Sequence, residues 1–148
     1  MHRDIKAANV FLSKNGDVKL GDLNVSAIEV ESMMQTQTGT PYQCPPEIWR
    51  SEKYDSKCDI WSLGCVIYEL TTLNPPFLAK TINKLKETAI KGEYSALPAV
   101  FSPNLSQMIR GMIVVDPKLR LSASDLLNHP ALLQKQAEMS RSNNSTPS

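Results

Sequence analysis

The stretch that decides how this chain is interpreted is His2-Arg3-Asp4-Ile5-Lys6-Ala7-Ala8-Asn9. Lys6 stands two positions after Asp4, and Asn9 stands five positions after it. A carboxylate, an ammonium group and an amide therefore occur within one short segment, and proton transfer and the binding of hard metal ions use such groups. The residues that follow indicate which structure could hold the three groups in place.

A β-hairpin is predicted directly after this segment. Val10-Phe11-Leu12 and Val18-Lys19-Leu20 are short strand-like runs, and Asn15-Gly16 lies between them. That dipeptide suits a tight turn, because both residues tolerate positive φ. The hairpin would carry Asn9 at its entry and Asp22 at its exit, so both side chains can face one small volume.

The rest of the chain is predicted to be mainly helical. A short helix with proline in its first turn is expected over 46–50. Residues 57–72 leave little polar face, which predicts a buried central helix. A lysine-rich surface helix is expected over 80–91 and a core-facing helix over 105–113. Residues 122–125 resemble a capping box that opens a last helix. Two other segments lack such patterns: residues 23–45, interpreted as a mobile loop, and 133–148, interpreted as a polar, disordered tail.

The composition excludes several classes of protein. Of the 148 residues, 41% are hydrophobic and 21% charged, and 16 basic side chains nearly balance 15 acidic ones, so neither nucleic-acid binding nor attachment to an anionic membrane is indicated. The most apolar stretch, 60–68, is too short to cross a bilayer. The N-terminus does not resemble a signal peptide. Three cysteines without a C-x-x-C pair favour an intracellular, cytoplasmic location over a disulfide framework or a zinc site.

Further motifs follow the opening segment in a fixed order. They are Gly21-Asp22-Leu23-Asn24, Gly39-Thr40-Pro41-Tyr42, Pro45-Pro46-Glu47, Asp59-Ile60-Trp61-Ser62-Leu63-Gly64 and Asp116-Pro117-Lys118-Leu119-Arg120. Together they resemble the eukaryotic serine/threonine protein kinases over nearly the whole chain, from residue 2 to about residue 130. Phrases at 10–16, 39–42, 59–65 and 68–77 are similar to the NIMA-related (Nek) group, which implies an association with the cytoskeleton or cilia by analogy alone.

The resemblance implies catalytic roles for five residues. Asp4 would be the catalytic base, and Lys6, which marks the serine/threonine branch, would neutralise the transferring phosphoryl group. Asn9 and Asp22 would hold the Mg²⁺ ion that binds the phosphates of ATP, and their oxygen ligands suit that ion. Thr40 would bond to the lysine and the base. The implied cofactors are therefore ATP and Mg²⁺, and the implied substrates are proteins with serine or threonine.

The resemblance also implies structural and regulatory roles. Glu47 and Arg120 should form a buried salt bridge, in which loss of one partner leaves a costly bare charge. Asp59 should accept hydrogen bonds from the backbone of the opening segment. Thr36 stands where activation-loop phosphorylation is common in this group, and a phosphate there could pair with Arg3. Ser32 and Thr38 compete with Thr36 for that role.

The sequence departs from the family pattern in the Asp22 motif. Leu23 replaces the usual phenylalanine and keeps a hydrophobic plug. Asn24 replaces glycine, and asparagine tolerates left-handed geometry better than most residues. We interpret this as altered switching rather than lost chemistry, because the metal ligand Asp22 is kept.

The expected fold is mainly α with one small β-hairpin, as in the C-terminal lobe of the protein-kinase fold (α+β), truncated before the catalytic loop. Residues 1–132 would be a partial kinase domain. Without the helix that normally packs beside the central one, parts of Trp61, Val66, Ile67 and Leu70 would be exposed, and each large apolar side chain left in water forfeits about 1.5–3 kcal/mol. The chain alone is thus expected to be marginally stable or to aggregate. It is also expected to be inactive alone, because it lacks the N-terminal lobe that binds ATP in these kinases.

Two functions are consistent with these observations. The first is ATP-dependent phosphorylation of protein serine or threonine as part of a full kinase domain. The alternative is a catalytically inactive module that docks on a partner through an exposed helical face or residues 80–91. A small-molecule phosphotransferase is disfavoured, because such enzymes are not expected to carry the Gly-Thr-Pro and Pro-Glu docking segment.

Overall fold

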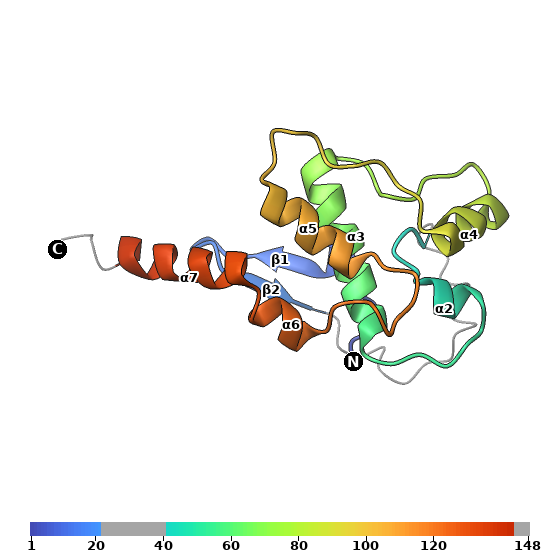
Figure 1. Ribbon diagram of the computed structural model, residues 1–148, viewed down its shortest axis with the longest axis horizontal. Helices are drawn as coiled ribbons and strands as arrows, with labels where there is room; N and C mark the ends of the chain where they lie inside the picture. The colour runs from blue at the N-terminus through green and yellow to red at the C-terminus, as the bar shows by residue number, and fades with distance from the viewer. Residues whose placement is uncertain (22–40, 144–148) are drawn as a thin grey trace.

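The computed structural model describes residues 1–21 and 41–143 (Figure 1). In chain order, the elements are a 3₁₀ turn, two strands and six helices: η1 (Ala7–Asn9), β1 (Val10–Leu12), β2 (Val18–Leu20), α2 (Pro46–Trp49), α3 (Lys57–Thr72), α4 (Ile82–Lys91), α5 (Pro103–Met112), α6 (Ala123–Leu127) and α7 (Pro130–Asn143). The described part is therefore mainly helical with one small antiparallel sheet, as the sequence predicts.

The hairpin forms where expected, but its turn differs from the expected one. Leu12 pairs with Val18, and Ser13 N donates to Asp17 O at 2.9 Å, so the loop consists of residues 14–16. Gly16 takes φ +85°, and Asn15 does not adopt a positive φ. A loop of this length ends in a left-handed residue that glycine occupies without a Cβ penalty, so only one of the two residues needs the unusual conformation.

The central helix α3 has the predicted bounds, and α5 packs closely against it. Gly64 permits this approach, because a Cβ there would lie 2.8 Å from Met112 Cβ and 2.9 Å from Ile113 Cγ1. Leu73 ends α3 in the left-handed conformation (φ 58°), and its N–H donates to Glu69 O. The core of the described residues forms around α3.

Four side chains of the central helix were expected to be partly exposed, and this expectation is wrong for two of them. Trp61 is 0% exposed and Val66 is 2% exposed, whereas Leu70 is 66% exposed. Ile67 is half-buried. The rings of Trp61 and Phe77 stack with centroids 5.4 Å apart, so the connection after α3 covers a surface that sequence reasoning had left bare.

The polar segment after residue 132 is also misjudged, because residues 130–143 form α7. Its residues are mostly good helix formers, and Pro130 occupies the first helical position. Ala131 N donates to His129 Nδ1, and Lys135 pairs with Glu138 three residues on. Figure 1 shows α7 extending away from α2–α5. In the described ranges, no helix combines the length and apolar character needed to cross a membrane.

Candidate active site

The opening segment is anchored to the first turn of α3 by one carboxylate. Asp59 Oδ2 accepts a hydrogen bond from His2 N at 2.6 Å, and Asp59 Oδ1 accepts one from Arg3 N at 2.7 Å. Arg3 has φ 70°, a left-handed conformation that costs a non-glycine residue about 1–3 kcal/mol. Hydrogen bonds to a charged acceptor are stronger than neutral ones, so Asp59 can hold this strained turn. These are the backbone contacts expected of Asp59.

The imidazole of His2 ties the same segment to the end of the hairpin. His2 Nδ1 accepts a hydrogen bond from Asp4 N at 3.3 Å, and His2 Nε2 lies 3.0 Å from Gly21 O. Because Nδ1 is an acceptor, the proton of the neutral ring belongs on Nε2, which donates to the carbonyl. His2 is buried, so this bridge is shielded from water.

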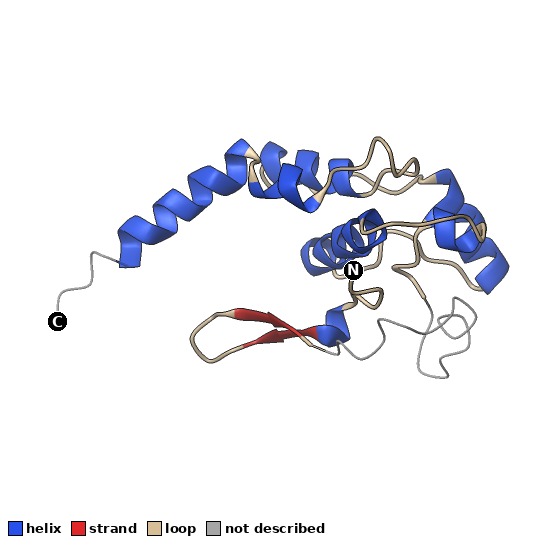
Figure 2. Ribbon diagram, turned by 90° about the horizontal axis from the view of Figure 1, so that it is seen from below, coloured by secondary structure: helices blue, strands red, loops and turns tan. Residues whose placement is uncertain are grey.

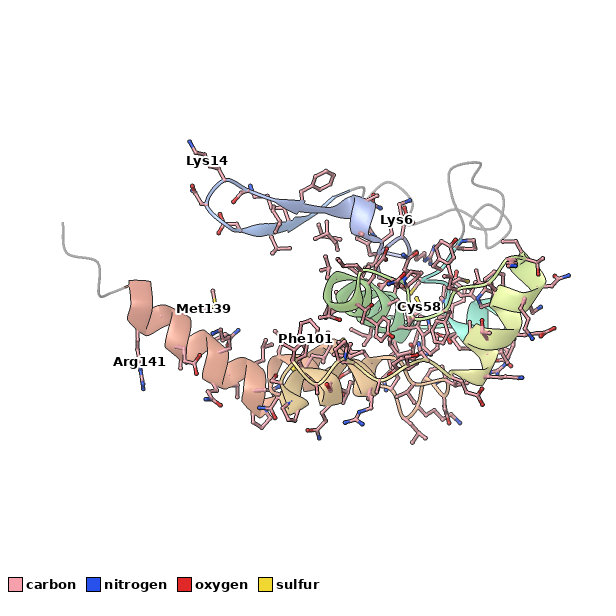
Figure 3. The ribbon with its side chains drawn as sticks, turned by 90° about the horizontal axis from the view of Figure 1, so that it is seen from above. Lys6, Lys14, Cys58, Phe101, Met139 and Arg141 are labelled. Carbon is pink, nitrogen blue, oxygen red and sulfur yellow. The ribbon has the colours of Figure 1, made fainter. Side chains whose placement is uncertain are left out.

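Two predicted catalytic residues, Lys6 and Asn9, contact the same oxygen atom of a third, Asp4. Lys6 Nζ lies 2.8 Å from Asp4 Oδ2, and Asn9 Nδ2 donates to the same Oδ2 at 2.9 Å. Asn9 Nδ2 also donates to the backbone carbonyl of Asp4 at 2.8 Å. Both bonds use the amide nitrogen, and Asn9 Oδ1 is therefore the atom of that side chain that could bind a cation. Figure 3 shows Lys6 where the hairpin meets the helical body.

This ion pair serves geometry more than stability. The side chains of Lys6 and Asp4 are 42% and 24% exposed, and a partly solvated pair contributes only about 0–1 kcal/mol. Asn9, by contrast, is buried in η1, and its backbone carbonyl accepts from Gly21 N at 2.9 Å. The Asn9 side chain is thus held by two hydrogen bonds to Asp4 and its backbone by Gly21, whereas the Lys6 side chain is partly exposed.

A second ion pair lies in the interior and joins α2, the start of α3 and the connection between α5 and α6. Arg120 donates to both carboxylate oxygens of Glu47, at 2.7 and 2.9 Å, and the two side chains are 0% and 2% exposed. Arg120 also donates to Lys57 O and Val114 O, and its guanidinium lies 5.1 Å from the ring centroid of Trp61. The predicted pairing of Glu47 with Arg120 is present, and it links α2 to the start of α3.

The three thiols are poor nucleophiles. Burial raises the pKa of Cys44 to about 12, with the Glu47 carboxylate as a second cause, and burial likewise raises the pKa of Cys58 to about 12. Burial also raises the pKa of Cys65. The thiolate is the reactive form, so none of these residues competes with Asp4 as the chemical centre.

The comparison with known families decides what these motifs belong to. The protein kinase domain family matches residues 1–132. The chain belongs to the protein kinase family. It is 46% identical over 130 residues to the serine/threonine-protein kinase Nek3 of Mus musculus (86% of this chain, 25% of the relative). It is 42% identical over 135 residues to Nek5 of Homo sapiens (89% and 19%). It is 42% identical over 142 residues to the G2-specific protein kinase nim-1 of Neurospora crassa (94% and 17%).

These relatives confirm the similarity to the NIMA-related kinases. The chain spans a quarter or less of the length of each of the three. The family assignment therefore applies to this kinase-domain segment.

Several predicted site residues of this kinase segment lie outside the described residues. They are Asp22, Thr36 and Thr40, together with Leu23, Asn24, Ser32 and Thr38. Of the two residues implied to hold Mg²⁺, the structure thus describes Asn9 alone. Its oxygen is a hard ligand that suits this ion. Within residues 1–21 and 41–143, no three or more His, Cys, Asp or Glu side chains form a group that could hold a metal ion.

Sequence reasoning missed two contacts of this site. The Arg3 guanidinium lies over the ring of Tyr54, and the His2 ring bonds to Gly21 O. Tyr54 belongs to no motif, and its only sequence signal is that it is the one aromatic residue in the polar stretch 51–56.

Proposed function

We propose that this chain forms the catalytic loop and C-terminal lobe of a serine/threonine protein kinase, and that the whole protein transfers the γ-phosphoryl group of ATP to serine or threonine in proteins. One observation carries the proposal: Lys6 Nζ and Asn9 Nδ2 both contact Asp4 Oδ2 in a loop that Asp59 anchors. Phosphoryl transfer depends on positioning and charge neutralisation, and this arrangement provides both.

Each residue of the cluster has a separate task in the proposed reaction. Asp4 accepts a hydrogen bond from the substrate hydroxyl and directs it towards the phosphorus. Lys6, whose side chain is 42% exposed beside Asp4, neutralises charge on the transferring group. Asn9 Oδ1 and Asp22 would hold Mg²⁺, which would neutralise charge on the phosphates of ATP. Thr40, which lies outside the described residues, would bond to Lys6 and Asp4.

Regulation and location extend the proposal. Phosphorylation of Thr36 would place up to about two negative charges where Arg3 can pair with them. A cytoplasmic location stays a prediction from cysteine usage, and a cytoskeletal or ciliary association stays a prediction from the analogy with the Nek group. None of these predictions is needed for the catalytic proposal, so each can fail independently.

The proposal is tested by phosphotransfer from radiolabelled ATP to a protein substrate, using the full-length product of the gene. Asp4→Asn keeps the size of the side chain and removes its charge, so we expect activity to fall by about 10²–10⁴-fold. Lys135→Gln is the matched control, because it removes a charge from the exposed helix α7. Activity that survives Asp4→Asn would contradict the proposal.

A second function is favoured by one observation on the hairpin. Val10, Leu12, Val18 and Leu20 lie on one face of the sheet, and the last three are 74%, 67% and 43% exposed respectively. An aliphatic face of this kind suits a non-catalytic module that docks on a partner. Absence of both magnesium–ATP binding and phosphotransfer in the full-length product, with retained binding to a partner, would favour this second function.

A further inference from the structure

The connection between α2 and α3 contains one residue that behaves differently from its neighbours. Residues 51–53, 55 and 56 are exposed, whereas Tyr54 is half-buried. The Arg3 guanidinium carbon lies 5.9 Å from the centroid of the Tyr54 ring. That distance is within the range of a cation–π interaction, so Arg3 is one contact that can hold the Tyr54 ring in this otherwise exposed segment.

Two of the contacts of Arg3 come from adjacent parts of the chain. Its backbone N–H donates to Asp59 in the first turn of α3, and its side chain rests on Tyr54 a few residues earlier. The backbone of Arg3 itself is in the left-handed conformation, with φ 70°. Arg3 directly precedes Asp4, so a change in the Arg3 conformation redirects the carboxylate of Asp4.

We propose that Tyr54 is a positioning residue for phosphoryl transfer, whose ring holds the Arg3 side chain and thereby fixes the direction of Asp4. This inference rests on the proposed kinase function and extends it to a residue outside every recognised motif. Tyr54 touches no reacting atom, and it acts only through Arg3.

The chemistry of the contact defines which substitutions should be tolerated. The attraction comes from the quadrupole of the aromatic face, so phenylalanine keeps it and tryptophan strengthens it. Leucine is apolar and can cover the same surface, but it has no such face. If Tyr54 served only as an apolar cover for the connection, leucine would replace it without consequence.

The test compares Tyr54→Phe, Tyr54→Trp and Tyr54→Leu in the full-length protein, with kcat and the KM for ATP measured separately. We expect Tyr54→Leu to lower kcat by about threefold to tenfold with the KM for ATP unchanged, because only the orientation of Asp4 is altered. Tyr54→Phe and Tyr54→Trp should stay within about twofold of the wild type. Equal kcat in all four proteins, or an equal loss in all three variants, would overturn the inference.

A double-mutant cycle separates positioning from a loss of fold. If Tyr54 acts through Arg3, the double variant Arg3→Met/Tyr54→Leu should be no slower than Arg3→Met alone. Losses that multiply would show that Tyr54 acts by another route and would overturn the inference. A wild-type protein without phosphotransfer would instead refute the proposed function itself.

The contact between Arg3 and Tyr54 can be tested by NMR even if the protein has no phosphotransfer activity. The ring-current shift of the Arg3 side-chain protons should disappear in Tyr54→Leu and persist in Tyr54→Phe. Its absence from the wild type would overturn the inference.

Discussion

The helical body and the hairpin bury their apolar side chains to very different extents. Around α3, Trp61, Cys65 and Phe77 are at most 1% exposed. On the hairpin, one whole face is aliphatic, and Leu12 and Val18 are mostly in water. Figure 2 shows the hairpin lying apart from α5, α6 and α7, on the other side of α3. The helical body therefore has its own core, whereas the hairpin needs a cover.

The candidate site draws on both regions. Asp59 anchors Arg3 from the helical body, and the buried amide of Asn9 belongs to the hairpin side. An isolated two-stranded hairpin is marginally stable in water at best. We therefore expect the Asp59 side of the site to stay ordered under conditions in which the Asn9 side loosens, and substitutions in the two regions should separate these behaviours.

The largest expected effect comes from breaking the buried ion pair of the helical body. Arg120→Met leaves the Glu47 carboxylate buried without its partner and should reduce the free energy of unfolding by about 3–5 kcal/mol. Denaturant unfolding of the chain, followed by tryptophan fluorescence, measures this loss. Lys84→Met is the control, because it breaks the exposed pair with Glu87 and should change stability by less than about 1 kcal/mol. Equal effects of the two variants would contradict the importance assigned to burial.

A smaller effect is expected where α3 meets α5. Gly64→Ala places a Cβ less than 3 Å from Met112 Cβ and from Ile113 Cγ1, so the two helices must separate. We expect a loss of about 1–3 kcal/mol, typical of overpacking, despite the better helix propensity of alanine. Gln107→Ala, at an exposed position of α5, is the control. A Gly64→Ala variant as stable as the wild type would show that this interface can relax.

The elements that the sequence predicts well have a local cause. The helix at 57–72 follows from an apolar run, and the capping box at Ser122 and Asp125 follows from residues three apart. The Glu47–Arg120 pair spans distant parts of the sequence, and only the family resemblance indicates it. Residues that share a motif with known kinases are therefore predictable even when their partners lie far apart in the chain.

The misjudged features depend on tertiary contacts that no motif contains. The burial of Trp61 requires Phe77 from the connection after α3, and the half-burial of Tyr54 accompanies its contact with Arg3. The helix at 130–143 was missed because polarity was taken as a sign of disorder, whereas alanine, leucine, lysine and glutamate favour helix whether or not they are buried.

The hairpin can be weakened without touching the helical body. Gly16→Ala meets no atom within 4 Å, so its effect is confined to the backbone, where φ +85° costs an alanine about 1–2 kcal/mol. We expect faster hydrogen exchange at the amides of the β1–β2 ladder and an unchanged unfolding midpoint by tryptophan fluorescence. Asn15→Ala, in the same loop without a positive φ, is the control. A midpoint that shifts together with the exchange rates would show that the two regions unfold as one unit.

The smallest expected effect is a pH dependence at the start of α6. Hydrogen bonds from the Ser122 hydroxyl and then from its backbone N–H hold the pKa of Asp125 below its ordinary value of 3.8. A depressed folded-state pKa means that the stabilisation is complete above the unfolded value and is lost as the pH falls through the folded value. The ¹³C shift of the Asp125 carboxyl carbon should therefore titrate below pH 3.8 in the wild type and closer to that value in Ser122→Ala.

Ser124→Ala is the control. It leaves the capping box intact, since the Ser124 side chain is not part of that pair of bonds, and Asp125 should titrate in it as in the wild type. Because Asp125 is exposed, this change should leave the unfolding of the α3 core almost unaltered, and a large shift there would mean that α6 is coupled to the core more tightly than its packing implies.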